Sequence, residues 1–94
     1  MKYEIMYIVR PDLEEGKMKE VVSNFEKVLT DNKAKITFSK ELGQKELAYE
    51  IKKFKHGYYY LYQIEASKEA IKEFDRLALL SEEIIRHMII KLEE

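Results

Sequence analysis

The chain has 94 residues, of which 37% are charged, and its net charge is −1. This length predicts one domain over residues 1–94, and the near-neutral charge argues against a strongly basic nucleic-acid-binding protein. Cysteine is absent, which excludes disulfides and thiolate metal sites, and no apolar run reaches the roughly 18 residues of a membrane span.

The first predicted element is a strand over residues 3–9, where apolar side chains recur at every second position. Tyr7 and its alternating neighbours form a strongly apolar face, while Met6 and Ile8 lie on the opposite, half-apolar face. Pro11 ends the strand because proline cannot donate a ladder hydrogen bond. These residues are therefore better interpreted as a strand than as a signal peptide.

An amphipathic helix is predicted over residues 15–31, because apolar residues recur there at helical spacing. Gly16 costs the first turn of this helix some stability. Asp12 is a candidate for the start of the helix, and Asn32 is a candidate for a left-handed stop at its end.

Two further strands are predicted in the middle of the chain. Ile36 and Phe38 are expected to share one face of the earlier strand, and Gly43 marks a turn or a bulge after it. The later strand is expected to begin before the segment FKHG and to continue after it. The predicted ranges are 34–41 for the earlier strand and 46–53 and 57–65 for the later one, with an interruption at 54–57.

A second helix is predicted over residues 68–80, with Ser67 as its cap, and a last strand over residues 84–92. The order strand, helix, strand, strand, helix, strand predicts an α+β fold, the ferredoxin-like split βαβ sandwich. Right-handed crossovers place both helices on one face of a four-stranded antiparallel sheet in the order 4-1-3-2.

The segment HGYYYLYQIE raises the question of which face its tyrosines occupy. Alternation puts Tyr58, Tyr60 and Tyr62 on one face and Tyr59, Leu61 and Gln63 on the other. A base-stacking platform of the RNA-recognition-motif type would turn Tyr58 and Tyr60 outward and would bury Gln63. An unpaired buried polar group costs about 1–3 kcal/mol, so the first set is predicted to form core and the second to lie outside.

The sheet face away from the helices is then predicted to be apolar. Met6 and Ile8 contribute from the first strand, and Tyr59 and Leu61 from the third. The last strand contributes either Met88 and Ile90 or Ile85 and Ile89. An apolar patch of this kind usually marks an interface, and the alternative is partial cover by the domain's own loops or termini.

Charge is concentrated in the middle of the chain, because residues 33–56 carry a net +4. That segment is either a solvated, lysine-rich hairpin or a surface that attracts phosphate. Catalytic signatures are missing: the two histidines, His56 and His87, lie in different elements, and the serines have no paired base. No metal site, no cofactor and no enzymatic activity are therefore expected.

Several separated motifs stand out along the chain. They are Tyr3-Glu4-Ile5, Arg10-Pro11-Asp12, Gly43-Gln44-Lys45-Glu46-Leu47-Ala48-Tyr49-Glu50-Ile51-Lys52, Phe74-Asp75-Arg76-Leu77 and Ile85-Arg86-His87-Met88-Ile89-Ile90-Lys91. In this order they resemble the bacterial small-subunit ribosomal protein S-six (S6) family. Two positions depart from the family pattern, since Gln44 replaces a frequent basic residue and Glu50 a frequent proline.

The resemblance implies a structural protein of the cytoplasmic small ribosomal subunit. Such proteins bind small-subunit ribosomal RNA together with ribosomal protein S-eighteen (S18), which docks on the sheet. The implied partner contacts are Met6, Ile8, Tyr59, Leu61, Met88 and Ile90. The implied RNA contacts are Lys2, Lys45, Lys52, Lys53, Lys55, His56, Arg86 and Lys91.

Two other classes of protein have the same predicted fold. The first is a protein-interaction or regulatory module that homodimerises through its open sheet face. The second is an acylphosphatase-like enzyme, but an arginine in a glycine-bearing loop after the first strand is missing here. Pro11-Asp12-Leu13-Glu14 stands at that place and would repel a phosphate.

Overall fold

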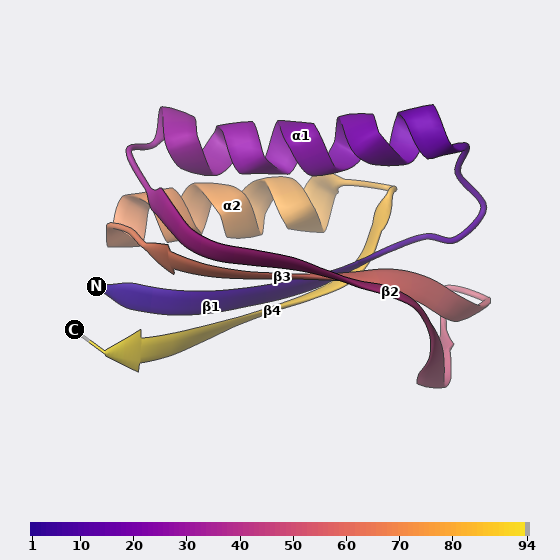
Figure 1. The fold of residues 1–94 in the computed structure, drawn as a ribbon. Coiled ribbons are helices and arrows are strands. Elements are labelled where there is room, and N and C mark those ends of the chain that lie inside the picture. The colour runs from indigo at the N-terminus through magenta and orange to yellow at the C-terminus, as the bar shows by residue number, and fades with distance from the viewer. Residues whose placement is uncertain (94) are drawn as a thin grey trace.

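The computed structural model describes residues 1–93, with residue 93 described by its backbone only (Figure 1). The elements are β1 (Lys2–Val9), α1 (Glu15–Asp31), β2 (Lys35–Ile51), β3 (Phe54–Glu65), α2 (Lys68–Leu80) and β4 (Ile84–Glu93). The four strands form one antiparallel sheet in the order β2-β3-β1-β4, and both helices cover the same face of it. The predicted ferredoxin-like fold and its strand order are thereby confirmed.

Both helices have the predicted bounds, and their apolar stripes face the sheet. Val21, Phe25 and Leu29 are buried on α1, and Phe74 is buried on α2. At the start of α2, the Ser67 hydroxyl accepts a hydrogen bond from the Ala70 amide at 3.2 Å, which satisfies one of the helix's free donors.

The two predicted ends of α1 differ from the structure. Asp12 does not start the helix, because its carboxylate is held by the Arg10 guanidinium at 2.7 Å, and that hydrogen bond lowers the pKa of Asp12. Asn32 is not left-handed either; it has φ −95, and its side-chain amide donates to the Val28 carbonyl at 2.8 Å. The following residue, Lys33, takes the left-handed conformation with φ 65.

The helix-covered core contains the tyrosines that alternation assigns to it. Tyr62 is 2% exposed and Tyr60 is 7% exposed, while Tyr58 packs against the core from its edge. The hydroxyls of Tyr7 and Tyr62 lie 2.6 Å apart, and Tyr62 donates to Glu26 at 3.2 Å. Three rings are therefore buried or packed inward, and the deepest hydroxyls have the partners that burial requires.

The middle of the chain is one long hairpin, so the predicted boundaries there are wrong. Residues 46–51 are the end of β2 and not the beginning of β3, and the segment 54–57 is paired strand. The turn consists of Lys52 and Lys53 alone, with φ 50 and 70. A turn of this kind normally carries Asn-Gly, so the usual sequence signal of the turn is missing. Gly57 instead suggests an interruption at 54–57, where the strand in fact continues.

Irregular pairing along β2 and β4 redirects several side chains. A register shift separates Ile36 from Phe38, so Ile36 packs on the core and Phe38 is 45% exposed, which corrects their predicted common face. The register also shifts in β4, between Arg86, which pairs with Ile8, and Ile84, which pairs with Val9. It leaves Ile85 unpaired and packed with Ile8, whereas His87 and Ile89 stay on the helix side.

Candidate functional site

The sheet face opposite the helices, called here the open face, brings the six predicted partner contacts together. Met6 pairs with Leu61 on one side and Met88 on the other, and Ile8 pairs with Tyr59. Paired residues point to the same side of a sheet, so these side chains form one surface. Met88 is 40% exposed and Ile90 is 45% exposed, and Met6, Tyr59 and Leu61 are half-buried.

One end of the open face is covered by the chain's own hairpin. Between the pairs Glu46–His56 and Ile51–Phe54, β2 has four residues and β3 has one, so β2 bulges. The last part of the hairpin, residues 45–57 around the turn, is called here the hairpin end. It bends away from the helices (Figure 1). Leu47 packs there on Ile8 and Ile85, which buries Ile8 to 5% exposure. Ile8 therefore offers a partner little surface. The chain covers this end of the sheet itself, but with a residue of strand β2 and not with a loop or a terminus.

Gly57 permits this close packing. A Cβ atom at this position would lie 2.3 Å from Cγ2 of Ile8 and 3.3 Å from the carbonyl oxygen of Val9. Because real Cβ atoms do not approach other atoms so closely, β3 can cross the end of β1 only with glycine here. The residue is needed for close approach and not as a turn.

The bulge encloses an apolar hollow of about 210 Å³ on the open face. Its floor is formed by Ile8 and Leu47, and its outer wall by Tyr49, which is 61% exposed. Pattern analysis missed Leu47 and Tyr49 as surface-forming residues, because their place depends on the bulge. The residues that line the hollow are Met6, Ile8, Leu47, Ala48, Tyr49, Ile51, Tyr59, Arg86, His87 and Met88.

Cations stack on aromatic rings around this end of the sheet. Nζ of Lys45 lies 5.9 Å from the centre of the Tyr59 ring, and Cζ of Arg86 lies 5.8 Å from that of Tyr49. The Arg86 guanidinium also donates to the Tyr49 hydroxyl. Arg10 lies over Phe54 at 5.0 Å and is a further basic residue at this end, one that was not among the predicted RNA contacts.

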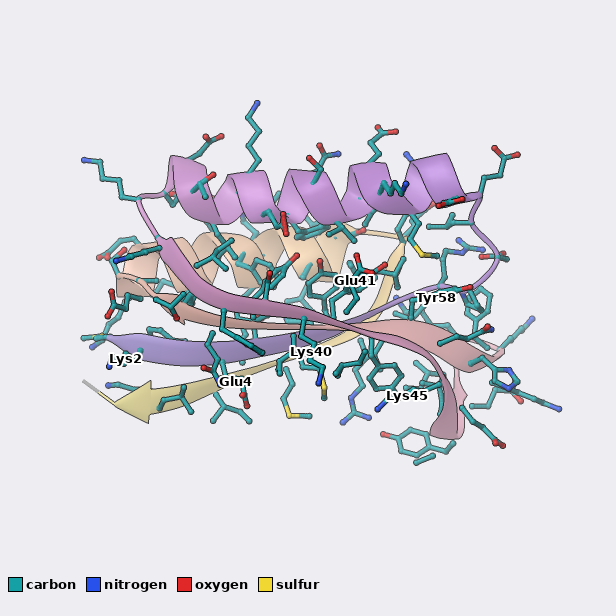
Figure 2. All side chains as sticks on the ribbon, viewed as in Figure 1. Lys2, Glu4, Lys40, Glu41, Lys45 and Tyr58 are labelled. Carbon is teal, nitrogen blue, oxygen red and sulfur yellow. The ribbon has the colours of Figure 1, made fainter. Side chains whose placement is uncertain are left out.

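The predicted RNA contacts fall into two groups at opposite ends of β1. Lys2 begins β1, and Lys91 pairs with Tyr3 beside it. The other six belong to the hairpin end or to the start of β4, about 23 Å away at 3.3 Å per residue. Figure 2 shows Lys2 and Lys45 separated in this way, with Lys45 on the side away from the helices.

The turn at Lys52 and Lys53 combines charge with backbone strain. The left-handed region is unfavourable for residues with a Cβ atom, yet both lysines occupy it. Among residues 1–93, the ion pairs include neither these two lysines nor Lys45 and Lys55. Their ammonium groups are exposed and available to an external anion.

The two histidines lie in separate elements and have structural surroundings. His87 is held by the Asp75 carboxylate at 2.6 Å, as expected for a satisfied histidine at the edge of the core, and His56 lies in a paired strand. No group of three or more potential ligands among residues 1–93 is placed to hold a metal ion. In the same part of the chain, neither helix has the length and apolar character needed to cross a membrane.

Comparison with known proteins agrees with this fold. The crystal structure of 30S ribosomal protein S6 from Thermotoga maritima superposes with a TM-score of 0.91. The two chains are 28% identical, and the match covers 97% of this chain and 86% of that one. The family model of ribosomal protein S6 matches residues 2–91. The chain therefore belongs to the ribosomal protein S6 family, whose members are structural, non-catalytic proteins of the small ribosomal subunit.

Proposed function

We propose that this chain binds small-subunit ribosomal RNA cooperatively with S18, with protein and RNA meeting different parts of its surface. The open face, through Met6, Tyr59, Leu61, Met88 and Ile90, meets S18. The hairpin end, through Lys45, Lys52, Lys53, Lys55, His56 and Arg86, meets the RNA. Lys2 and Lys91 form a second, smaller RNA contact at the far end of β1.

The observation that carries the RNA assignment is the strained turn of two lysines. Asn-Gly would occupy a turn with two left-handed residues at lower cost, so local stability does not explain Lys52 and Lys53. Strain that survives in a folded protein is often associated with function. Two exposed ammonium groups at the tip of a projecting hairpin suit contact with phosphates.

The net charge supports the cooperative part of the proposal. With a net charge of −1, the chain has little long-range attraction for RNA. Phosphate contacts dominate affinity for nucleic acids, so a hairpin end with four lysines, Lys45, Lys52, Lys53 and Lys55, binds RNA weakly by itself. A partner that covers the apolar open face and adds its own RNA contacts raises the affinity without any change in this chain.

The test measures binding to central-domain small-subunit RNA by fluorescence anisotropy, with and without purified S18. We expect weak binding by the chain alone and at least about tenfold tighter binding with S18 present. Tight, specific binding by the isolated chain at physiological salt would contradict the cooperative model. A stable homodimer in light scattering that is indifferent to RNA would instead favour the homodimerising module.

The residue assignment is tested by the double variant Lys52→Asn/Lys53→Gly. Relief of left-handed strain should raise the free energy of unfolding by about 1–2 kcal/mol. RNA affinity should fall. The slope of log affinity against log salt concentration should become shallower by the amount that corresponds to about two lost phosphate contacts. The matched control is Lys33→Gly, because Lys33 is also left-handed, with φ 65, but lies at the end of α1. It should stabilise the chain and leave RNA binding unchanged.

A further inference from the structure

The hollow on the open face has the size of one aromatic side chain. A cavity of about 150 Å³ lined by apolar side chains binds benzene, and the hollow measures about 210 Å³. Its floor is fixed, because Ile8 and Leu47 are 5% and 7% exposed and pack on Ile85. The site is therefore already formed in the free chain and needs no rearrangement to accept a ring.

The chemistry of the walls favours a protein side chain over an RNA base. Met6, Ile8, Leu47 and Met88 offer only apolar atoms to an occupant. The polar edge of a base would lose its water there without a replacement, at a cost for each unpaired group. The rings of Tyr49 and Tyr59 each have a cation over one face, which leaves them less free to stack with a base.

The charges around the hollow indicate which kind of group should lie next to the inserted ring. Arg86 lines the hollow and is held against Tyr49, and Lys45 lies over Tyr59 beside it. No aspartate or glutamate belongs to the lining. The lining has one cation, Arg86, and no carboxylate, and a second cation, Lys45, lies beside it, so an acidic group next to the inserted ring is complementary to the hollow.

We infer that this hollow is the anchor site for the protein partner: it takes one aromatic side chain from a segment that also carries an adjacent carboxylate. The inference rests on the proposed function, in which the open face meets a protein. It adds that binding is concentrated at the hairpin end of that face. Interfaces commonly depend on a few anchors seated in such pockets.

A small-molecule pair tests the site without any partner protein. 3-Phenylpropionate combines a ring with a carboxylate, and phenethylamine has a similar size and an opposite charge. We expect 3-phenylpropionate to shift the methyl resonances of Met6 and Met88 with an affinity of about 1–10 mM, which is ordinary for so small a ligand. Phenethylamine should shift them several-fold less. Equal shifts from both probes, or none from either, would overturn the inference.

A matched pair of variants tests the anchor in the complex with S18. Tyr49→Ala removes the outer wall of the hollow, and Phe38→Ala removes another exposed β2 aromatic that lies outside it. Tyr49→Ala should weaken S18 binding about tenfold or more, and Phe38→Ala by less than about twofold. Unchanged melting temperatures would show that both variants fold.

The outcomes separate this inference from the function on which it rests. If the wild-type chain binds S18 and both variants weaken that binding equally, the assignment of the anchor site is wrong and the proposed function stands. If the wild-type chain does not bind S18 at all, the proposed partner is wrong, and the 3-phenylpropionate titration alone then decides whether the hollow accepts a ring with a carboxylate.

Discussion

The two faces of the sheet contain similar side chains but differ in how completely they are covered. On the helix side, Tyr7, Tyr62 and Phe74 are almost fully buried, and the buried hydroxyls are hydrogen-bonded. On the open face, only the hairpin end is covered, and Met88 and Ile90 remain 40% and 45% exposed. Apolar composition alone therefore does not mark the core. The helices decide which face is core, and the uncovered face is left for a partner.

The largest effect that separates the two faces should come from adjacent tyrosines. Tyr60→Ala removes a ring that is 7% exposed and should lower the free energy of unfolding by about 3–5 kcal/mol. Tyr59→Ala removes a half-buried ring on the open face and should cost about 1–2 kcal/mol, while weakening S18 binding. Urea denaturation measures both changes. Equal losses of stability would refute the assignment of faces.

Alkaline pH should destabilise the helix-covered face through its buried phenols. Burial raises the pKa of Tyr7 and of Tyr62 above the value near 10 that they have when unfolded. Their contribution to stability is complete below about pH 10 and is lost as pH rises further, because only the unfolded chain releases these protons. The free energy of unfolding should fall by about 2.7 kcal/mol per pH unit for the two groups.

Urea denaturation at a series of pH values above 10 checks this slope. Tyr7→Phe provides the control, since it removes one of the two phenols and should roughly halve the slope. A stability that stays constant above pH 10 would mean that the two phenols ionise equally well in the folded chain.

A smaller effect on the open face should come from Gly57. Gly57→Ala places a methyl group against Ile8 and should destabilise the chain by about 1–3 kcal/mol. Gly16→Ala provides the contrast, because nothing lies within 4 Å of the added Cβ in α1. It should stabilise the chain by about 0.5–1 kcal/mol. Thermal or urea unfolding measures both, and a Gly57→Ala variant as stable as the wild type would show that the hairpin end adjusts freely.

Much of the fold was predictable because it depends on local periodicity. Helical spacing gives both helices with their bounds, and alternation gives the buried faces of β1 and β3, including the division of the tyrosines around Tyr59 and Tyr60. The handedness of crossovers then fixes the strand order. Alternation also placed Met6, Ile8, Tyr59 and Leu61 on the open face. It left two choices for β4, and the pairing of β4 with β1 decided for Met88 and Ile90.

The hairpin end was decided only by the tertiary structure. A bulge shifts the register of everything beyond it, and whether a strand bulges depends on the partner strand and on the packing beneath it. The bulge in β2 sets Leu47 on Ile8 and Ile85, and it leaves room for the hollow under Tyr49. The turn at Lys52 and Lys53 contradicts local preference and is held by the pairing on both sides of it. The sequence by itself thus determined the order and kind of the elements and the faces of β1 and β3, whereas contacts between strands far apart in the chain determined the shape of the surface that they present.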